Sequence, residues 1–223
     1  MKALIFDSSS LINLTMNGLI EILIELKKIF NGKLIITQHV KYETIDRPSS
    51  IRKYELGSLQ IKKLLDTNIL EMPSSLGIQE QEIKETTKEI LSKVNSSYYA
   101  KEFMHIIDEG EASCLATSLI ANKKKIENLI VIDERTTRMI VENPENLRKL
   151  FESKLHSRII LQENFDYLKN TKFIRSAELL FVAYKKGLIK LGKENVLQAL
   201  LYASKYKGCA ISEEEIREIE KMA

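Results

Sequence analysis

Cysteine and histidine are scarce in this sequence. There are two cysteines, Cys114 and Cys209, among 223 residues, and three histidines, His39, His105 and His156. They lie far apart and match neither the paired spacing of zinc ligands nor a redox motif. The spacing therefore gives no sign of a zinc or redox centre. A disulfide between the two cysteines stays open, but isolated cysteines in apolar settings are more often buried thiols in a reducing compartment.

Long apolar runs are also missing. No stretch approaches the ~20 apolar residues of a membrane-spanning helix. Only four apolar residues separate Lys2 from Asp7, too few for the core of a signal peptide. We therefore expect a soluble cytoplasmic protein. No glycine-rich phosphate loop and no nucleophile elbow is present, which argues against a P-loop nucleoside triphosphatase or a serine hydrolase.

The bulk composition is that of a globular chain. Hydrophobic residues make up 44% of it, enough for a substantial core in one domain with an elaboration. The formal net charge is only +3. This mild excess permits a polyanionic partner without requiring one.

Short apolar runs alternate with helical periodicity over the first two thirds of the chain. Runs at 3–6, 34–36, 68–72 and 129–132 predict buried strands. Strands alternating with helices indicate an α/β domain with a parallel sheet. The C-terminal part has helical spacing over 177–184, over 196–203 and from Ser212 onward, so helices follow this domain.

Three further segments carry weaker patterns. The charged segment 78–94 predicts an exposed inserted helix, because charge runs are usually solvated faces. Residues 98–107 predict another short helix, and residues 158–161 predict a fifth strand at the edge of the sheet. Pro144 marks a break after the helix that follows residue 134.

Four acids occupy corresponding places in this pattern. Asp7 and Asp133 end the first and fourth strands, while Glu43 and Glu111 fall in early helical turns beside strand ends. The carboxyl ends of parallel strands share one crevice, where ligands bind. Clustered carboxylates repel one another unless a cation neutralises them, and oxygen ligands select hard ions such as Mg²⁺ or Mn²⁺. A lone strand-end Asp is, however, more often a helix N-cap than a ligand.

The four acids lie in segments that resemble the motifs of the PIN-domain nucleases. In chain order the segments are Leu4-Ile-Phe-Asp7-Ser8-Ser9-Ser10, Ile36-Thr-Gln-His-Val40-Lys-Tyr-Glu43, Asp108-Glu-Gly110-Glu111-Ala112 and Ile132-Asp133-Glu134-Arg135-Thr-Thr-Arg138. Each motif alone is weak, whereas four in order, each on the expected element, are strong.

The resemblance implies a three-layer PIN-like α/β fold with a central parallel sheet and a C-terminal helical extension. We assign the catalytic domain to 1–143, with a helical insertion at 78–103. Residues 144–172 are interpreted as an insertion or edge-strand segment. Residues 173–223 form the extension packed on the domain.

The resemblance also implies the site residues. The acidic metal-binding set would be Asp7, Glu43, Glu111 and Asp133, with Ser8 supporting the site by hydrogen bonding near Asp7. Asp108 lies in the third motif as well, but Glu111 is preferred because small residues follow it at the family's spacing. The fourth motif offers both Asp133 and Glu134, and both remain candidates for the metal.

The function implied is cleavage of RNA phosphodiester bonds by an endoribonuclease that uses Mg²⁺ or Mn²⁺. Such an enzyme would be a toxin of a toxin–antitoxin pair, with an antitoxin protein as partner, or an RNA-processing enzyme, and the family often forms homodimers. Two alternatives stay open: a non-catalytic RNA-binding scaffold, and a metal-dependent phosphatase using the same acids.

Other side chains offer weaker leads toward nucleic acid. Arg135 and Arg138 follow the fourth acid and could position a phosphate, although surface arginines are as often salt-bridge partners. The basic run 123–125 is better explained as a solvated loop than as an RNA contact. Tyr98 and Tyr99 could stack on bases, but packing in the core or at an interface is the better explanation.

Overall fold

The central sheet of the computed structural model has five parallel strands in the order β3-β2-β1-β5-β7. The structure describes residues 1–191 and 196–223. The strands are β1 (Lys2–Phe6), β2 (Lys33–Ile36), β3 (Leu70–Glu71), β5 (Glu127–Val131) and β7 (Phe173–Ile174). The apolar runs 3–6, 34–36 and 129–132 become the three inner strands because both of their faces are covered, and run 68–72 contains the edge strand β3. The expected α/β fold with a parallel sheet is confirmed.

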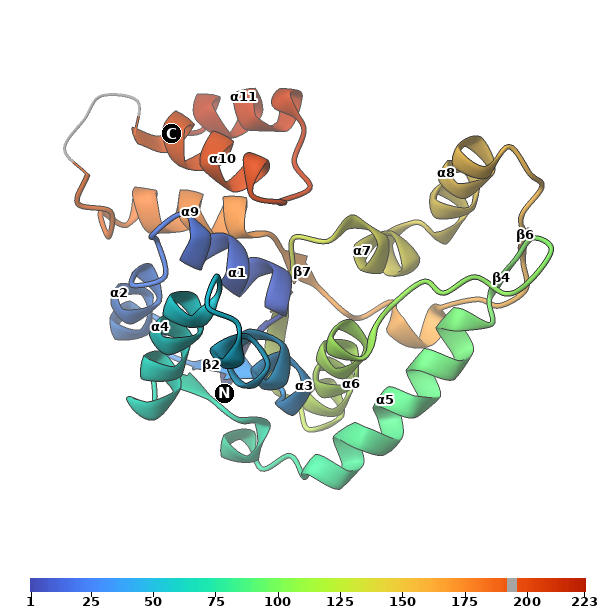
Figure 1. The fold of residues 1–223 in the computed structure, drawn as a ribbon, viewed down its shortest axis with the longest axis horizontal. Helices are drawn as coiled ribbons and strands as arrows, with labels where there is room; N and C mark the ends of the chain where they lie inside the picture. The colour runs from blue at the N-terminus through green and yellow to red at the C-terminus, as the bar shows by residue number, and fades with distance from the viewer. Residues whose placement is uncertain (192–195) are drawn as a thin grey trace.

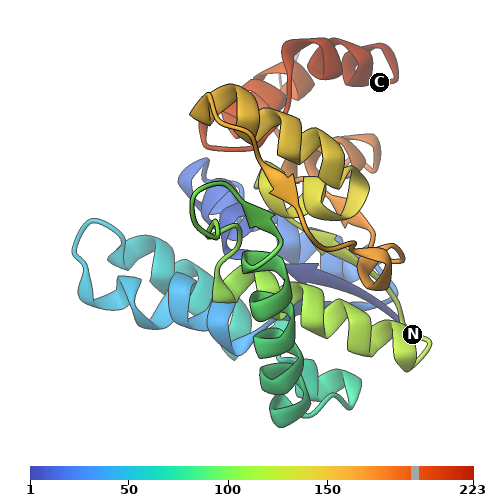
Figure 2. The same ribbon diagram turned by 90° about the vertical axis from the view of Figure 1, so that its right-hand side faces the viewer.

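Helices cover both faces of this sheet and make a three-layer arrangement (Figures 1 and 2). Those around the sheet are α1 (Ser8–Met16), α2 (Ile22–Ile29), α3 (Gln38–Lys41), α4 (Glu55–Asp66), α5 (Glu80–Asn95) and α6 (Glu109–Lys123). A π-helical turn, η1 (Tyr42–Asp46), continues α3, and short 3-10 turns lie at Pro48–Ser50, Pro73–Leu76 and Asp166–Leu168. Helix α6 packs on β1 and β5, and α1 packs against α4.

Helix α5 is not the exposed insertion expected from its charges. Its apolar face contributes Ile83, Ile90 and Val94 to the main core, each at most 2% exposed. This face packs along α6 (Figure 1). The charged residues fill only the opposite face, so α5 is an amphipathic layer helix.

Residues 98–107 contain no helix, which corrects a second expectation. Tyr98–Tyr99 form β4, which pairs antiparallel with β6 (Ile160–Leu161) in a separate two-stranded ribbon. The predicted strand at 158–161 therefore exists but does not join the main sheet, whose edge is β7 instead. Tyr98 is fully buried and its hydroxyl donates to the carbonyl of Pro144, which confirms the core role of this aromatic side chain.

The break at Pro144 separates two helices, α7 (Arg135–Glu142) and α8 (Pro144–Leu155). Proline is tolerated at the first position of α8, where its missing N–H has no helical partner, and Asn143 caps that helix. Segment 144–172 thus contains a helix that the sequence pattern did not predict, and this helix lies beside α7.

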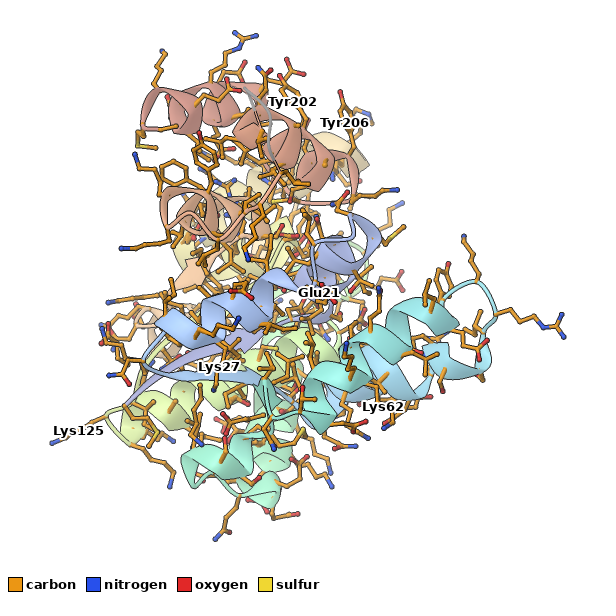
Figure 3. All side chains as sticks on the ribbon, turned by 90° about the vertical axis from the view of Figure 1, so that its left-hand side faces the viewer. Glu21, Lys27, Lys62, Lys125, Tyr202 and Tyr206 are labelled. Atoms are coloured by element: carbon orange, nitrogen blue, oxygen red, sulfur yellow. The ribbon has the colours of Figure 1, made fainter. Side chains whose placement is uncertain are left out.

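Three helices follow β7: α9 (Ser176–Lys185), α10 (Val196–Tyr206) and α11 (Glu213–Lys221). They share a second apolar cluster that includes Ala177, Leu201 and Ile216. Leu180 and Leu200 also reach the main core, so the extension packs on the domain. Figure 3 shows Tyr202 and Tyr206 together on α10, where their rings stack at 6.2 Å. Among the described residues, no helix combines the length and apolar character that crossing a membrane needs.

Candidate metal centre

The carboxyl ends of the strands bring the predicted acids to one edge of the sheet. Asp7 follows β1, and Asp133 follows β5, its neighbour in the sheet. Glu43 lies in η1, and Glu111 lies in the first turn of α6. The charge of Asp7 raises the pKa of both Glu43 and Glu111, and the charge of Asp133 raises the pKa of Asp7. Asp7 is therefore the common neighbour of the other three.

Asp7 uses only half of its carboxylate for structure. It is 2% exposed and is the N-cap of α1, with Oδ2 accepting from the Ser9 amide at 3.0 Å and from the Ser9 hydroxyl at 2.6 Å. Its Oδ1 is buried with no partner among the described residues. Burial raises the pKa of Asp7 despite the helping contacts from Ser9. Capping explains one oxygen of this side chain and leaves the other available to a cation.

Ser9, rather than Ser8, is the hydroxyl that holds Asp7. The same Ser9 hydroxyl accepts from the backbone N–H of Asp133 at 3.1 Å, so it joins the ends of β1 and β5. The hydroxyl of Ser8 instead lowers the pKa of Glu43 by a hydrogen bond. Ser8 thus supports the site through Glu43, while Ser9, the middle residue of a run of three serines, is the hydroxyl partner of Asp7 and was not singled out from the sequence.

Glu43 lies against a glycine of the third motif. A Cβ on Gly110 would lie 2.6 Å from Oε2 of Glu43 and 2.8 Å from Oε1. Only hydrogen at this position lets the carboxylate of Glu43 lie so close to α6. Burial raises the pKa of Glu43, and the charge of Asp7 raises it further.

We expect Gly110→Ala to keep the fold and to damage the site. The added methyl group would displace the flexible carboxylate of Glu43, while alanine favours the helix over glycine by about 1 kcal/mol. The melting temperature should therefore stay level or rise while the Mn²⁺ affinity falls about tenfold. Calorimetric titration and thermal melting measure both. Gly57→Ala is the matched control, because its Cβ would meet a methyl of Thr15 instead. Unchanged Mn²⁺ affinity in Gly110→Ala would contradict the placement of Glu43 in the centre.

Glu111 is half-buried and turned toward the start of its own helix. Its Oε2 accepts from the backbone N–H of Asp108 at 2.7 Å. Burial raises the pKa of Glu111 to about 8, and the charges of Asp7 and Glu134 add to this shift. Asp108, the other acid of the third motif, is exposed and pairs with His105 at 2.6 Å. Glu111 is therefore the acid of this motif that faces the centre.

The two acids of the fourth motif have different roles. Asp133 is 1% exposed and both of its oxygens are occupied: Oδ1 accepts from the amide of Ser176 at 2.7 Å, and Oδ2 accepts from its hydroxyl at 2.6 Å. Asp133 thus caps α9 from a distant part of the chain. Glu134 is only half-buried, caps α7 through Oε2 at 2.8 Å from the Thr137 amide, and lies near enough to raise the pKa of Glu111. The geometry favours Glu134 over Asp133 as the acid available to a cation.

A buried hydrogen-bonded chain behind Asp133 was not predicted from the sequence. The Ser176 hydroxyl lies 2.7 Å from the Ser204 hydroxyl, and the side-chain amide of Asn13 donates to the Ser204 carbonyl at 2.8 Å. Small polar residues inside apolar helices, such as Asn13 in α1, were the only signal for it. These hydrogen bonds connect α9 and α10 to the acid-bearing end of the sheet.

His39 lies at the edge of this cluster, whereas the basic run 123–125 lies at the other end of the sheet. His39 pairs with Glu109 at 3.2 Å, and its charge lowers the pKa of Glu43. The lysines of run 123–125 are exposed at the end of β5 opposite the acids, and Figure 3 shows Lys125 projecting outward. Both cysteines are free and buried, as expected.

The acids fit a cation by their chemistry and by the open Oδ1 of Asp7. Among the described residues, no three acidic, histidine or cysteine side chains stand in the arrangement of a ready-made metal site. The carboxylates do not converge on one point because Glu111 accepts from the Asp108 amide and Asp133 accepts from the Ser176 amide. The donor set contains only oxygen, which suits Mg²⁺ or Mn²⁺ better than a softer metal.

Comparison with known proteins gives little further guidance. No protein-family model matches the chain, and no solved structure matches it. A protein of Bartonella quintana that carries the name of an ABC transporter ATP-binding protein is 25% identical over 96 residues. The match covers 43% of this chain and 42% of that protein. Segment 187–194 comes nearest to a phosphate loop, but it ends in Glu194 rather than Ser or Thr and follows α9 rather than a strand.

Proposed function

We propose that this protein is a metal-dependent nuclease of the PIN type that hydrolyses RNA phosphodiester bonds. The observation that carries the proposal is the buried, unpartnered Oδ1 of Asp7, with Glu43 and Glu111 both buried enough, and both close enough to the charge of Asp7, for their pKa values to be raised. Such a cluster is costly unless a cation neutralises it. The motif resemblance favours RNA as the substrate.

Four side chains would hold Mg²⁺ or Mn²⁺: Asp7, Glu43, Glu111 and Glu134. A divalent ion bound there supplies positive charge against the negative charge that develops on the phosphate during attack by water. Ser9 and Gly110 serve the site by fixing Asp7 and by making room for Glu43. Asp133 acts through Ser176 and is a positioning residue. The free thiols are consistent with a cytoplasmic location.

The direct test is cleavage of a fluorescent single-stranded RNA with Mn²⁺, with and without EDTA. We expect metal-dependent cleavage, and we expect Glu134→Gln to lower the rate about 100-fold and to raise the Mn²⁺ concentration needed. Glu127→Gln is the matched control, since Glu127 is an exposed acid at the opposite end of β5. Wild-type rates in Glu134→Gln would remove this residue from the site.

Two outcomes would replace the proposal with another function. Faster hydrolysis of a small phosphomonoester than of any RNA would make the protein a phosphatase. RNA binding with no cleavage in Mn²⁺ or Mg²⁺ would make it a non-catalytic RNA-binding module.

A further inference from the structure

A pocket of about 570 Å³ lies beside the acid site, between α7, the start of α8 and the segment before α11. Its charged lining includes three arginines and two glutamates. Arg135 directly follows Glu134, so the pocket begins next to the proposed metal centre. The Ala210 peptide links the two, because its N–H donates to the Asp133 carbonyl at 3.1 Å.

One of the three arginines is already neutralised. Arg175 is 8% exposed and pairs with Glu178 and with Glu215, the latter at 2.8 Å. It also donates to the carbonyl of Ala210 at 2.8 Å. Its guanidinium therefore builds the wall of the pocket and is not free for a ligand.

The other two arginines lack such partners. Neither Arg135 nor Arg138 has a carboxylate within ion-pair distance among residues 1–191 and 196–223. Arg138 is half-buried and makes one long contact, from Nη2 to the Ala210 carbonyl at 3.4 Å, while its Nε is buried without a partner. A half-buried guanidinium with so few partners is expensive unless an anion compensates it.

Amide groups at the same pocket would complete an anion site. Asn143 accepts from the Asn146 amide through Oδ1, and no hydrogen bond engages its side-chain NH₂ among the described residues. The side chain of Asn146 lines the same space. Planar guanidinium groups with amide donors nearby are the usual partners of phosphate oxygens.

We propose that this pocket holds a backbone phosphate of the bound RNA strand, next to the phosphate that is cleaved. The proposal rests on the proposed nuclease function for the identity of the strand. It assigns Arg135 and Arg138 to binding the strand and leaves the chemistry to the acids.

The test measures binding rather than cleavage. Asp7→Asn protein is titrated with a fluorescent single-stranded RNA at several salt concentrations, alone and with Arg135→Gln or Arg138→Gln added. We expect each added change to weaken binding about tenfold and to reduce the slope of log K against log salt by about 0.7 per lost phosphate contact. Arg158→Gln is the matched control: Arg158 is exposed, carries the same charge and lies outside the pocket.

The possible outcomes separate the pocket proposal from the nuclease proposal. Binding and salt slopes equal to those of Arg158→Gln would overturn the pocket proposal, even if the wild type cleaves RNA. Arginine-dependent binding without cleavage by the wild type would keep the pocket and reject the nuclease. Arginine-dependent binding of adenosine monophosphate as tight as that of the strand would reassign the pocket to a free nucleotide. Arg135 is exposed, so its variant separates a binding loss from a folding loss should Arg138→Gln unfold.

Discussion

Asp7→Asn should abolish RNA cleavage, by at least about 10³-fold, while the protein stays folded. Asparagine is as good an N-cap as aspartate, so the contact with the Ser9 amide and the start of α1 should survive. What is lost is the negative charge at the buried Oδ1, and a ligand charge in a metal centre is worth several kcal/mol. Mn²⁺-dependent cleavage rates measure the loss. Asp66→Asn, an exposed aspartate of α4, is the control. Equal rates in Asp7→Asn and wild type would reject the metal centre.

The same substitution should raise the stability of the metal-free protein. Burial raises the pKa of Asp7 above its ordinary value of 3.8, so ionising this side chain costs free energy in the folded state. The wild type therefore loses stability as the pH rises from about 3.8 through the raised pKa, and asparagine removes this loss. The gain of Asp7→Asn in melting temperature should be absent at low pH and grow with pH. Saturating Mn²⁺ should stabilise the wild type and not the variant.

Asp133→Ala should destabilise the fold by about 2–4 kcal/mol, the largest loss expected from any single acid. It would remove the Asp133 oxygens that accept from Ser176 at a fully buried helix start, leaving the Ser176 amide without an acceptor and its hydroxyl with Ser204 alone. Asp133→Asn should lose less, because its amide oxygen can still accept from the Ser176 N–H. Chemical denaturation measures these differences, and Glu127→Ala, an exposed change at the other end of β5, should be within 0.5 kcal/mol of wild type.

Measuring both stability and Mn²⁺ affinity in variants of Asp133 and Glu134 shows which of the two acids is the metal ligand. If Asp133→Ala stays as stable as the wild type but no longer binds Mn²⁺, then Asp133 is a ligand and its contact with Ser176 is incidental. If it is destabilised while Glu134→Gln loses Mn²⁺ affinity and keeps its stability, the roles are as assigned here.

The acid-bearing strands were predictable because their signals are local. An apolar run such as 3–6 or 129–132, followed at once by Asp, identifies a buried strand and its end without reference to any other part of the chain. Parallel pairing of β1 with β5 then brings Asp7 and Asp133 to the same edge.

The errors concern contacts between distant segments. Strands β4 and β6 have two residues each, too few to show the alternation of apolar and polar residues that marks a strand. They form because residues 98–99 pair with residues 160–161. The many charges of α5 predicted an exposed helix, because the sequence does not show that α6 covers its apolar face. Likewise, nothing near Asp133 in the sequence indicates that Ser176 would occupy both of its oxygens.

The hydrogen-bonded chain from Ser9 through Asp133, Ser176 and Ser204 to Asn13 has a consequence for synthesis. Asn13 and Ser204 are 191 positions apart, and the buried polar groups of each lack a hydrogen-bond partner until the other residue is in place. While the chain is being translated, α1 and β5 can form without α10, but Asp133 cannot be fixed until Ser176 emerges, and Ser176 cannot be fixed until Ser204 does. We therefore expect the acid site to be among the last parts of the molecule to become ordered as the chain folds.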